Sequence, residues 1–199
     1  MSWEKPLLLL GVLAGLVVSG IGPADRLTWL LEVTPVVIAL PLLVTTHGRF
    51  PLTPLLYRLI ALHAAILLLG AHYTYAQVPL GFWVQDVFDL SRNHYDRLGH
   101  VAQGFIPAMI AREILIRRSP LVPGKWLFFL VVCVCLAISA FYEFIEWWVS
   151  LLAGAEGDAF LATQGDVWDT QWDMFLAMCG AIGAQLLLAR VQDRQLARL

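Results

Sequence analysis

Residues Trp126–Trp147 read WLFFLVVCVCLAISAFYEFIEW, an apolar run of 22 residues whose only charged members are Glu143 and Glu146. A helix of roughly 20 residues spans the hydrocarbon core of a bilayer, so this run predicts a membrane-crossing helix. Further runs of this kind lie at residues 6–22, 28–44, 55–76, 95–111 and 169–189. We therefore predict an all-α fold, a polytopic membrane helical bundle with six transmembrane helices, and a single transmembrane domain over residues 1–199.

The composition favours a membrane protein over a soluble one. Apolar residues make up 59% of the chain and charged residues 14%, and the mean hydropathy is +0.73. A soluble domain of this composition would have too little polar surface to cover itself, whereas a bilayer removes that requirement. We expect the lipid bilayer as the partner of this chain, and no nucleic acid.

Two features concern the connections and the packing of these helices. The segment Gln77–His94 contains Trp83 and Phe88 and is expected to be an interfacial loop. Gly180 and Gly183, with the alanines near them, give the last helix a face of small residues. Such faces allow membrane helices to approach closely, so close helix packing is predicted there.

The distribution of basic residues predicts the orientation. Loops rich in Lys and Arg near the ends of membrane helices are retained in the cytoplasm. With six spans, ten of the thirteen basic residues fall on the side of the N-terminus, and three, Arg26, Arg92 and Arg97, fall on the other. We predict that both termini are cytoplasmic and that the chain lies in a bacterial cytoplasmic (inner) membrane.

Acidic residues gather on the opposite, outer side. Several lie on common helical faces because they are spaced by three, four or seven residues: Asp96 with His100, Glu143 with Glu146, and Asp166 with Asp169 and Asp173. At about 1.5 Å of rise per residue, His100 lies roughly 18 Å, and Glu143 and Asp173 roughly 26 Å, from the cytoplasmic ends of their helices. We therefore expect the three polar faces to meet within the outer leaflet.

Ionised groups at this depth should be paired, hydrated or bound to a metal. Carboxylates with an imidazole suit Mg²⁺, Mn²⁺, Fe²⁺ or Zn²⁺, so a divalent metal ion is the expected cofactor. The predicted ligands are Asp96, His100, Glu143, Asp169 and Asp173. Glu146 or Asp166 is the candidate general base, because partial burial raises the pKa of a carboxylate. The alternative is a hydrated structural cap in which Arg92 and Arg97 neutralise some of the acids.

Four segments carry a resemblance to a known family. These are AHYTYAQVPLG (71–81), RNHYDRLGHVAQG (92–104), YEFIEW (142–147) and GDVWDTQWDM (165–174). The chain resembles the YjdF-type bacterial inner-membrane proteins over essentially its whole length. The resemblance implies a cytoplasmic-membrane location and no particular reaction. The resemblance implies that His72, Tyr75, Arg92 and Asn93 belong to the same polar set as the acidic residues described above. Arg97 is a further candidate for this polar site.

A more distant similarity is to the VanZ-like membrane proteins. Their pattern is an Asp-x-x-x-His helix, a helix bearing Glu, and a final Asp-x-x-x-Asn-x-x-Gly helix. Asp96 and His100 match the first element, and Glu143 or Glu146 matches the second. The third element departs from the pattern, because Asp173 stands where Asn is usual. This resemblance implies a role in the cell envelope.

Three classes of function stay open on the sequence. The first is a metal-dependent protein that acts on or binds a lipid-linked or other envelope substrate. The second is a small transporter or an ion- or proton-translocating protein, in which the acids concentrate cations. The third is a non-catalytic membrane scaffold with a polar cap.

Overall fold

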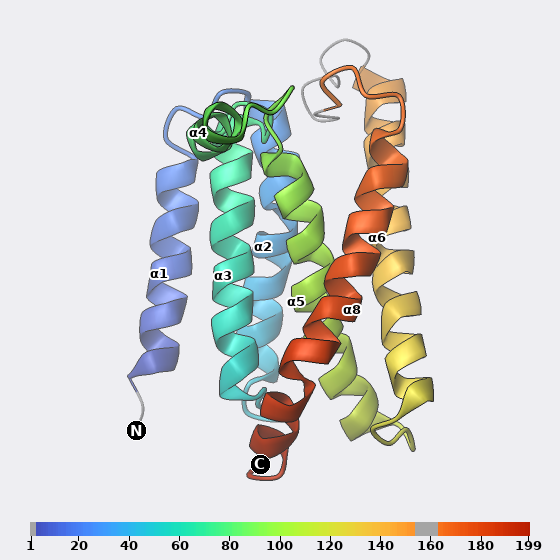
Figure 1. Ribbon diagram of the computed structural model, residues 1–199. Helices are drawn as coiled ribbons and strands as arrows, with labels where there is room; N and C mark the ends of the chain where they lie inside the picture. Colours follow the sequence, from blue (N-terminus) through green and yellow to red (C-terminus); the bar gives the residue numbers. More distant parts are fainter. Residues whose placement is uncertain (1–2, 154–162) are drawn as a thin grey trace.

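A computed structural model describes residues 3–153 and 163–199. Within these residues the chain is helical and contains no strand: α1 (Glu4–Ser19), α2 (Arg26–Thr46), α3 (Pro54–Tyr73), α4 (Pro79–Phe88), α5 (Tyr95–Arg118), α6 (Lys125–Ala153) and α8 (Asp169–Leu196). All of them except α4 run along the length of the bundle, and both chain termini lie at the same end of it (Figure 1). The all-α prediction is confirmed for the described residues.

Among the described helices, four are long and apolar enough to cross a membrane. They are Arg26–Thr46, Pro54–Tyr73, Lys125–Leu152 and Asp169–Leu196. Their outer surfaces carry many exposed apolar side chains, such as Ile38, Leu62, Phe129 and Leu187. A bilayer covers side chains that a soluble protein would have to bury. These helices confirm the prediction of a helical membrane protein with several spans.

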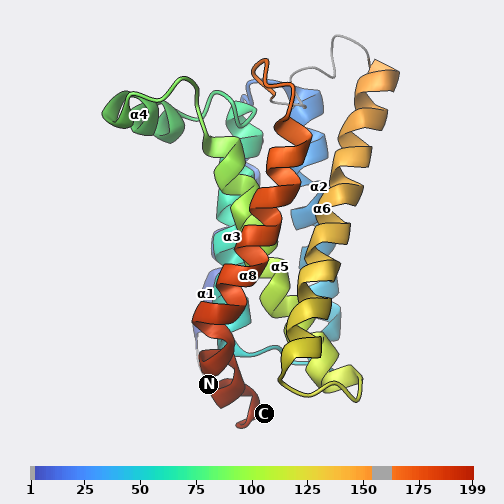
Figure 2. The same ribbon diagram turned by 45° about the vertical axis from the view of Figure 1, so that its right-hand side comes forward.

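The connection after α3 differs from the expected interfacial loop, because it contains the helix α4. Pro79 occupies the first turn of α4, where its missing N–H costs no hydrogen bond. Figure 2 shows α4 lying across the end of the bundle and extending away from it. Phe82, Trp83, Val87 and Phe88 are exposed on it, which is typical of a short helix lying at a membrane surface.

The close contact of α5 with α8 sets the geometry of the bundle. A Cβ atom on Gly104 of α5 would collide with the backbone oxygen of Ala177, and one on Gly180 of α8 would collide with that of Val101. Only glycine allows the two backbones to come so close. The predicted close packing is confirmed for Gly180, whereas it is wrong for Gly183, whose Cβ position faces open space.

A buried polar network fixes the end of the bundle where the termini lie. The carboxylate of Glu113 on α5 is fully buried. It accepts hydrogen bonds from the Thr53 backbone N–H (3.1 Å) and the Thr53 hydroxyl (2.8 Å), and it pairs with Arg117 at 2.8 Å. These contacts hold the connection between α2 and α3 against α5.

An apolar layer lies next to this network. Leu56 of α3, Met109 of α5, Val131 and Cys135 of α6 and Ala181 of α8 are almost fully buried in one cluster. Along α5, Met109 lies between His100 and Glu113 in sequence, and along α8, Ala181 lies between Asp173 and Asp193. The layer therefore separates the ionisable groups at the two ends of these helices.

Candidate functional site

Seven ionisable side chains from four helices lie at the end of the bundle remote from the termini. We name them the acidic cluster: Glu32 of α2, Asp96 and His100 of α5, Glu143 and Glu146 of α6, and Asp169 and Asp173 of α8. Each exposes no more than 9% of its surface. A group of acids buried to this extent requires partners of opposite charge, protons or a bound cation.

His100 lies at the centre of the cluster. Its Nε2 atom is 3.7 Å from Asp96 Oδ1 and 3.8 Å from Asp173 Oδ2. Both distances are too long for hydrogen bonds. Two ligand atoms that are each about 2.1 Å from one metal ion lie no more than about 4.2 Å apart, so both distances suit a shared ion.

Two groups of three residues in the described part of the chain bring candidate metal ligands together. The first is Asp96, His100 and Asp173, and the second is His100, Glu143 and Glu146. Within each group, the donor atoms all lie within 4.8 Å of one another. Both groups contain His100, so the imidazole stands between the α5–α8 carboxylates and those of α6.

Three donor atoms of these groups are buried and have no hydrogen-bond partner among the described residues: His100 Nδ1, Glu143 Oε1 and Asp173 Oδ1. Buried polar atoms in native proteins almost always have a partner. Leaving a donor or acceptor unsatisfied costs about 1–3 kcal/mol, and more for a charged group. The unpaired atoms therefore identify the part of the cluster where a ligand would be stabilising.

Two arginines cover the cluster on the side of the α4–α5 connection. Arg92 pairs with Asp169 at 2.7 Å and donates to the backbone oxygen of Thr163 at 2.6 Å. Arg97 pairs with Asp166 at 2.8 Å and lies over the Trp172 ring, 5.3 Å from its centroid. Asp169 is therefore neutralised by an arginine and belongs to neither metal-capable group.

The structure corrects the expected helical face formed by Asp166, Asp169 and Asp173. Asp166 precedes α8, since the helix begins only at Asp169, and it follows a turn at Gln164 and Gly165, whose backbones are left-handed (φ 50° and 83°). The Asp166 carboxylate accepts a hydrogen bond from the Trp168 N–H at 3.0 Å. Its other oxygen faces Arg97 and, at 3.7 Å, Arg92.

Glu32 and Tyr142 are members of the site that the sequence did not reveal. Tyr142 of α6 donates a hydrogen bond to Glu32 of α2 at 3.1 Å. Tyr75, buried beside Gly70 and Gly99, is a further neighbour of Glu32. An intramembrane carboxylate is a signal of function in itself, but its partners are distant in sequence, so only the fold assigns it to this cluster.

His72 and Asn93 do not lie in the acidic cluster. The Nδ1 atom of His72 is 2.9 Å from the backbone oxygen of Ser19, which links α3 to the end of α1. Asn93 is buried and donates to the Val78 backbone oxygen at 3.0 Å, and it accepts from the Tyr95 N–H at 3.0 Å. Both residues hold connecting segments in place.

The positive charge near the cluster comes from the two arginines rather than from His94. His94 stands just before α5, and its pKa is lowered by partial burial and by the nearby guanidinium groups of Arg97 and Arg92. The ordinary pKa of histidine is about 6.5, so His94 is neutral at neutral pH. Arg92 and Arg97 thus carry the charge that balances Asp166 and Asp169.

The fold and the cluster define a polytopic α-helical membrane protein with buried ionisable groups on four helices. The chain belongs to the family described as "Predicted membrane protein (DUF2238)", whose profile matches residues 5–194. It is 56% identical over 198 residues to the "Inner membrane protein YjdF" of Escherichia coli (strain K12), covering 98% of this chain and 95% of that protein. The resemblance to YjdF-type proteins is thereby confirmed. No solved structure matches the chain.

Proposed function

We propose that this protein binds a divalent metal ion through Asp96, His100 and Asp173, with Glu143 of the facing helix as a further ligand, and that it acts on a lipid-linked or other envelope substrate. The observation that carries the proposal is the arrangement around His100. Two carboxylates lie 3.7 and 3.8 Å from its Nε2 atom. Unpaired buried donor atoms remain on His100, Glu143 and Asp173.

The charges around these residues support a cation. Arg92 and Arg97 form ion pairs with Asp166 and Asp169. Among the described residues, no arginine or lysine forms an ion pair with Asp96, Glu143, Glu146 or Asp173. A divalent ion would offset the repulsion among these four carboxylates. Carboxylate oxygens with one imidazole suit Mg²⁺, Mn²⁺, Fe²⁺ or Zn²⁺.

A metal in this position would polarise a phosphoryl or carbonyl oxygen or activate a water molecule. Glu146 is the better candidate for a general base, because it lies close to His100 and Glu143 and forms no ion pair with an arginine or lysine among the described residues. Asp166 is paired with two arginines and belongs to neither metal-capable group, which makes it the weaker candidate for this role.

We further propose that α1, α2, α3, α5, α6 and α8 all cross the inner membrane and that both termini are cytoplasmic. Ten of the thirteen basic residues would then face the cytoplasm, as membrane insertion favours: Lys5, Arg49, Arg58, Arg112, Arg117, Arg118, Lys125, Arg190, Arg194 and Arg198. The acidic cluster would lie in the outer leaflet. The similarity to an inner membrane protein supports this location.

The alternative of ion or proton translocation has less support. A translocation path needs polar groups or water across the whole membrane. Met109, Val131, Cys135 and Ala181 form a closely packed apolar layer between the acidic cluster and the Glu113 network. That layer favours a binding site that is open to one side of the membrane over a path that crosses it.

Metal analysis of purified protein tests the proposal. Protein prepared without chelator, and reloaded with Mg²⁺, Mn²⁺ or Zn²⁺, is expected to retain stoichiometric metal after desalting. His100→Ala and Asp173→Ala should each lose it. Asp166→Asn is the matched control and should retain it, because Asp166 lies outside both metal-capable groups. A wild type that binds none of these ions, or a His100→Ala variant with full metal content, would refute the proposal.

A further inference from the structure

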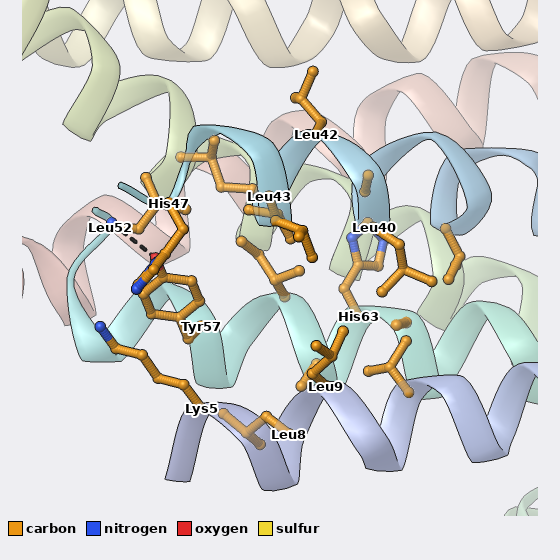
Figure 3. Close-up of a pocket in the computed structure, with 18 of the residues that line it drawn as sticks. Lys5, Leu8, Leu9, Leu40, Leu42, Leu43, His47, Leu52, Tyr57 and His63 are labelled. Carbon is orange, nitrogen blue, oxygen red and sulfur yellow. Dashed lines mark hydrogen bonds between the residues drawn. The ribbon is translucent and has the colours of Figure 1, made fainter. Parts of the chain in front are cut away.

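An apolar groove runs between α1 and α2, over α3, at the end of the bundle where the termini lie (Figure 3). Both α1 and α2 pack on α3 but scarcely on each other, so the face of α3 between them is uncovered by protein. The groove has a volume of about 740 Å³, within the range of roughly 300–1,000 Å³ usual for ligand pockets. It is large enough for a chain-like ligand.

The walls of the groove are almost wholly apolar. They include Leu9 and Val12 of α1, Leu40 and Leu43 of α2, and Ile60 and Leu67 of α3. Figure 3 shows Leu9 and Leu40 facing the space from opposite sides. Walls of this kind offer dispersion contacts and no hydrogen bonds, so they suit a hydrocarbon chain rather than a polar molecule.

Polar groups gather at the mouth of the groove. The Lys5 ammonium lies 4.8 Å from the centroid of the Tyr57 ring. The Tyr57 hydroxyl is 2.6 Å from His47 Nδ1 and accepts a hydrogen bond from the Leu52 N–H at 3.2 Å. The groove thus has a polar, cationic mouth and an apolar interior, which is the pattern of a lipid with a charged headgroup.

The charge of the mouth selects the kind of lipid. Three basic residues, Lys5, Arg49 and Arg58, lie in the segments that form this end of α1, α2 and α3, against one acidic residue, Glu4. Glu4 is paired with Arg58, which leaves a net positive charge. Basic groups at a membrane surface attract anionic lipids.

Among the described residues that line the groove, His63 is the one ionisable side chain beyond its mouth. It is six residues beyond Tyr57 on α3, or about 9 Å along the helix, and its Nε2 atom is buried without a partner among the described residues. A phosphate beside Lys5 would place the acyl chain, rather than the headgroup, at the level of His63. Substitution of His63 therefore distinguishes between two kinds of ligand: a phospholipid, and a molecule with a polar group deep in the groove.

We propose that the groove binds an acyl chain of an anionic phospholipid from the surrounding leaflet, with the lipid phosphate held at Lys5. This site lies at the other end of the bundle from the proposed metal site and does not depend on it. A lipid bound there would fill the gap between α1 and α2 and support the packing of both on α3.

Native mass spectrometry and lipid extraction of protein purified in mild detergent test this proposal. The wild type should retain anionic phospholipid in preference to zwitterionic phospholipid. Lys5→Glu should lower that retention about fivefold or more, and Ala39→Trp, which fills the groove, should abolish it. Lys125→Glu and Leu186→Trp are matched controls outside the groove and should retain lipid like the wild type.

His63→Leu completes the test, because it removes the deep polar group and leaves an apolar wall. The proposal predicts undiminished lipid retention in this variant. Loss of the ligand in His63→Leu would instead show that the groove holds a molecule with a polar group at that depth. The proposal is also refuted by a wild type free of lipid, by equal retention of zwitterionic lipid, or by Lys5→Glu and Ala39→Trp variants that retain lipid like the wild type.

Discussion

The hydroxyl of Tyr142 on α6 donates a 3.1 Å hydrogen bond to the carboxylate of Glu32 on α2, across 110 residues of sequence. The two helices make little other contact, so this bond links α2 to the acidic cluster. Glu32 is 5% exposed. Its carboxylate depends on such partners, because a buried charge without them is costly.

Tyr142→Phe is therefore expected to destabilise the protein by about 1–3 kcal/mol, the cost of leaving a buried polar group unsatisfied. Thermal unfolding in detergent measures the effect. Tyr73→Phe is the matched control, because the Tyr73 hydroxyl forms no hydrogen bond with another described residue. Equal melting temperatures for the two variants would argue against a stabilising role for the Glu32–Tyr142 bond.

The close contact of α5 and α8 predicts opposite effects at two neighbouring glycines. Gly180→Ala puts a methyl group against the Val101 backbone oxygen and should cost about 1–3 kcal/mol or more. Gly183→Ala faces open space and should be neutral or stabilising by up to about 1 kcal/mol, because alanine favours helices. Denaturation of both variants in the same detergent tests this, and a destabilised Gly183→Ala with an unaffected Gly180→Ala would contradict the packing described.

The Glu113 network should be a main source of stability at the end with the termini. Glu113→Ala leaves the partly buried Arg117 and the buried Thr53 without their partner, and removing one member of a buried pair costs about 3–5 kcal/mol. Glu4→Ala removes a solvent-exposed pair with Arg58 and should leave the melting temperature nearly unchanged. A Glu113→Ala variant as stable as Glu4→Ala would show that the network contributes little.

The proposed topology predicts the location of reporters fused at two positions. A fluorescent protein after Leu199 should be fluorescent and alkaline phosphatase there inactive, because the proposed topology places the C-terminus in the cytoplasm. Alkaline phosphatase inserted after Asp89, between α4 and α5, should be active. Phosphatase activity at the C-terminus would overturn the orientation.

Hydropathy predicted most of the helical architecture because long apolar runs leave few alternatives to a membrane helix. It did not predict α4, since a ten-residue segment is too short for a membrane span and its sequence resembles a loop. Nor could it show that Gly180 packs closely and Gly183 does not. That distinction depends on the direction from which α5 approaches α8.

Neighbouring residues of the site were predictable from the sequence where both lie on the same helix. The spacing of Asp96 and His100 placed both side chains on one face, and the structure holds them 3.7 Å apart. Asp166 was misplaced because the helical spacing was extended back through Val167 and Trp168, which precede the start of α8 at Asp169. Glu32 was missed because its partners, Tyr75 and Tyr142, come together only in the folded bundle.

Asp173 gives the most direct test of the metal site. Asp173→Asn is nearly isosteric and removes one carboxylate 3.8 Å from His100. If the cluster binds a metal, the change removes a ligand, and the protein loses the stabilisation that a bound ion provides, about 2.7 kcal/mol at a metal concentration one hundred times the Kd. If the cluster is a hydrated cap, the change relieves repulsion among carboxylates and is neutral or stabilising.

Thermal unfolding of the wild type and Asp173→Asn, each with and without chelator, separates these outcomes. The metal-site account predicts that chelator lowers the Tm of the wild type, that Asp173→Asn has a lower Tm than the metal-loaded wild type, and that chelator no longer affects the variant. An Asp173→Asn variant at least as stable as the wild type, with the same response to chelator, would contradict it.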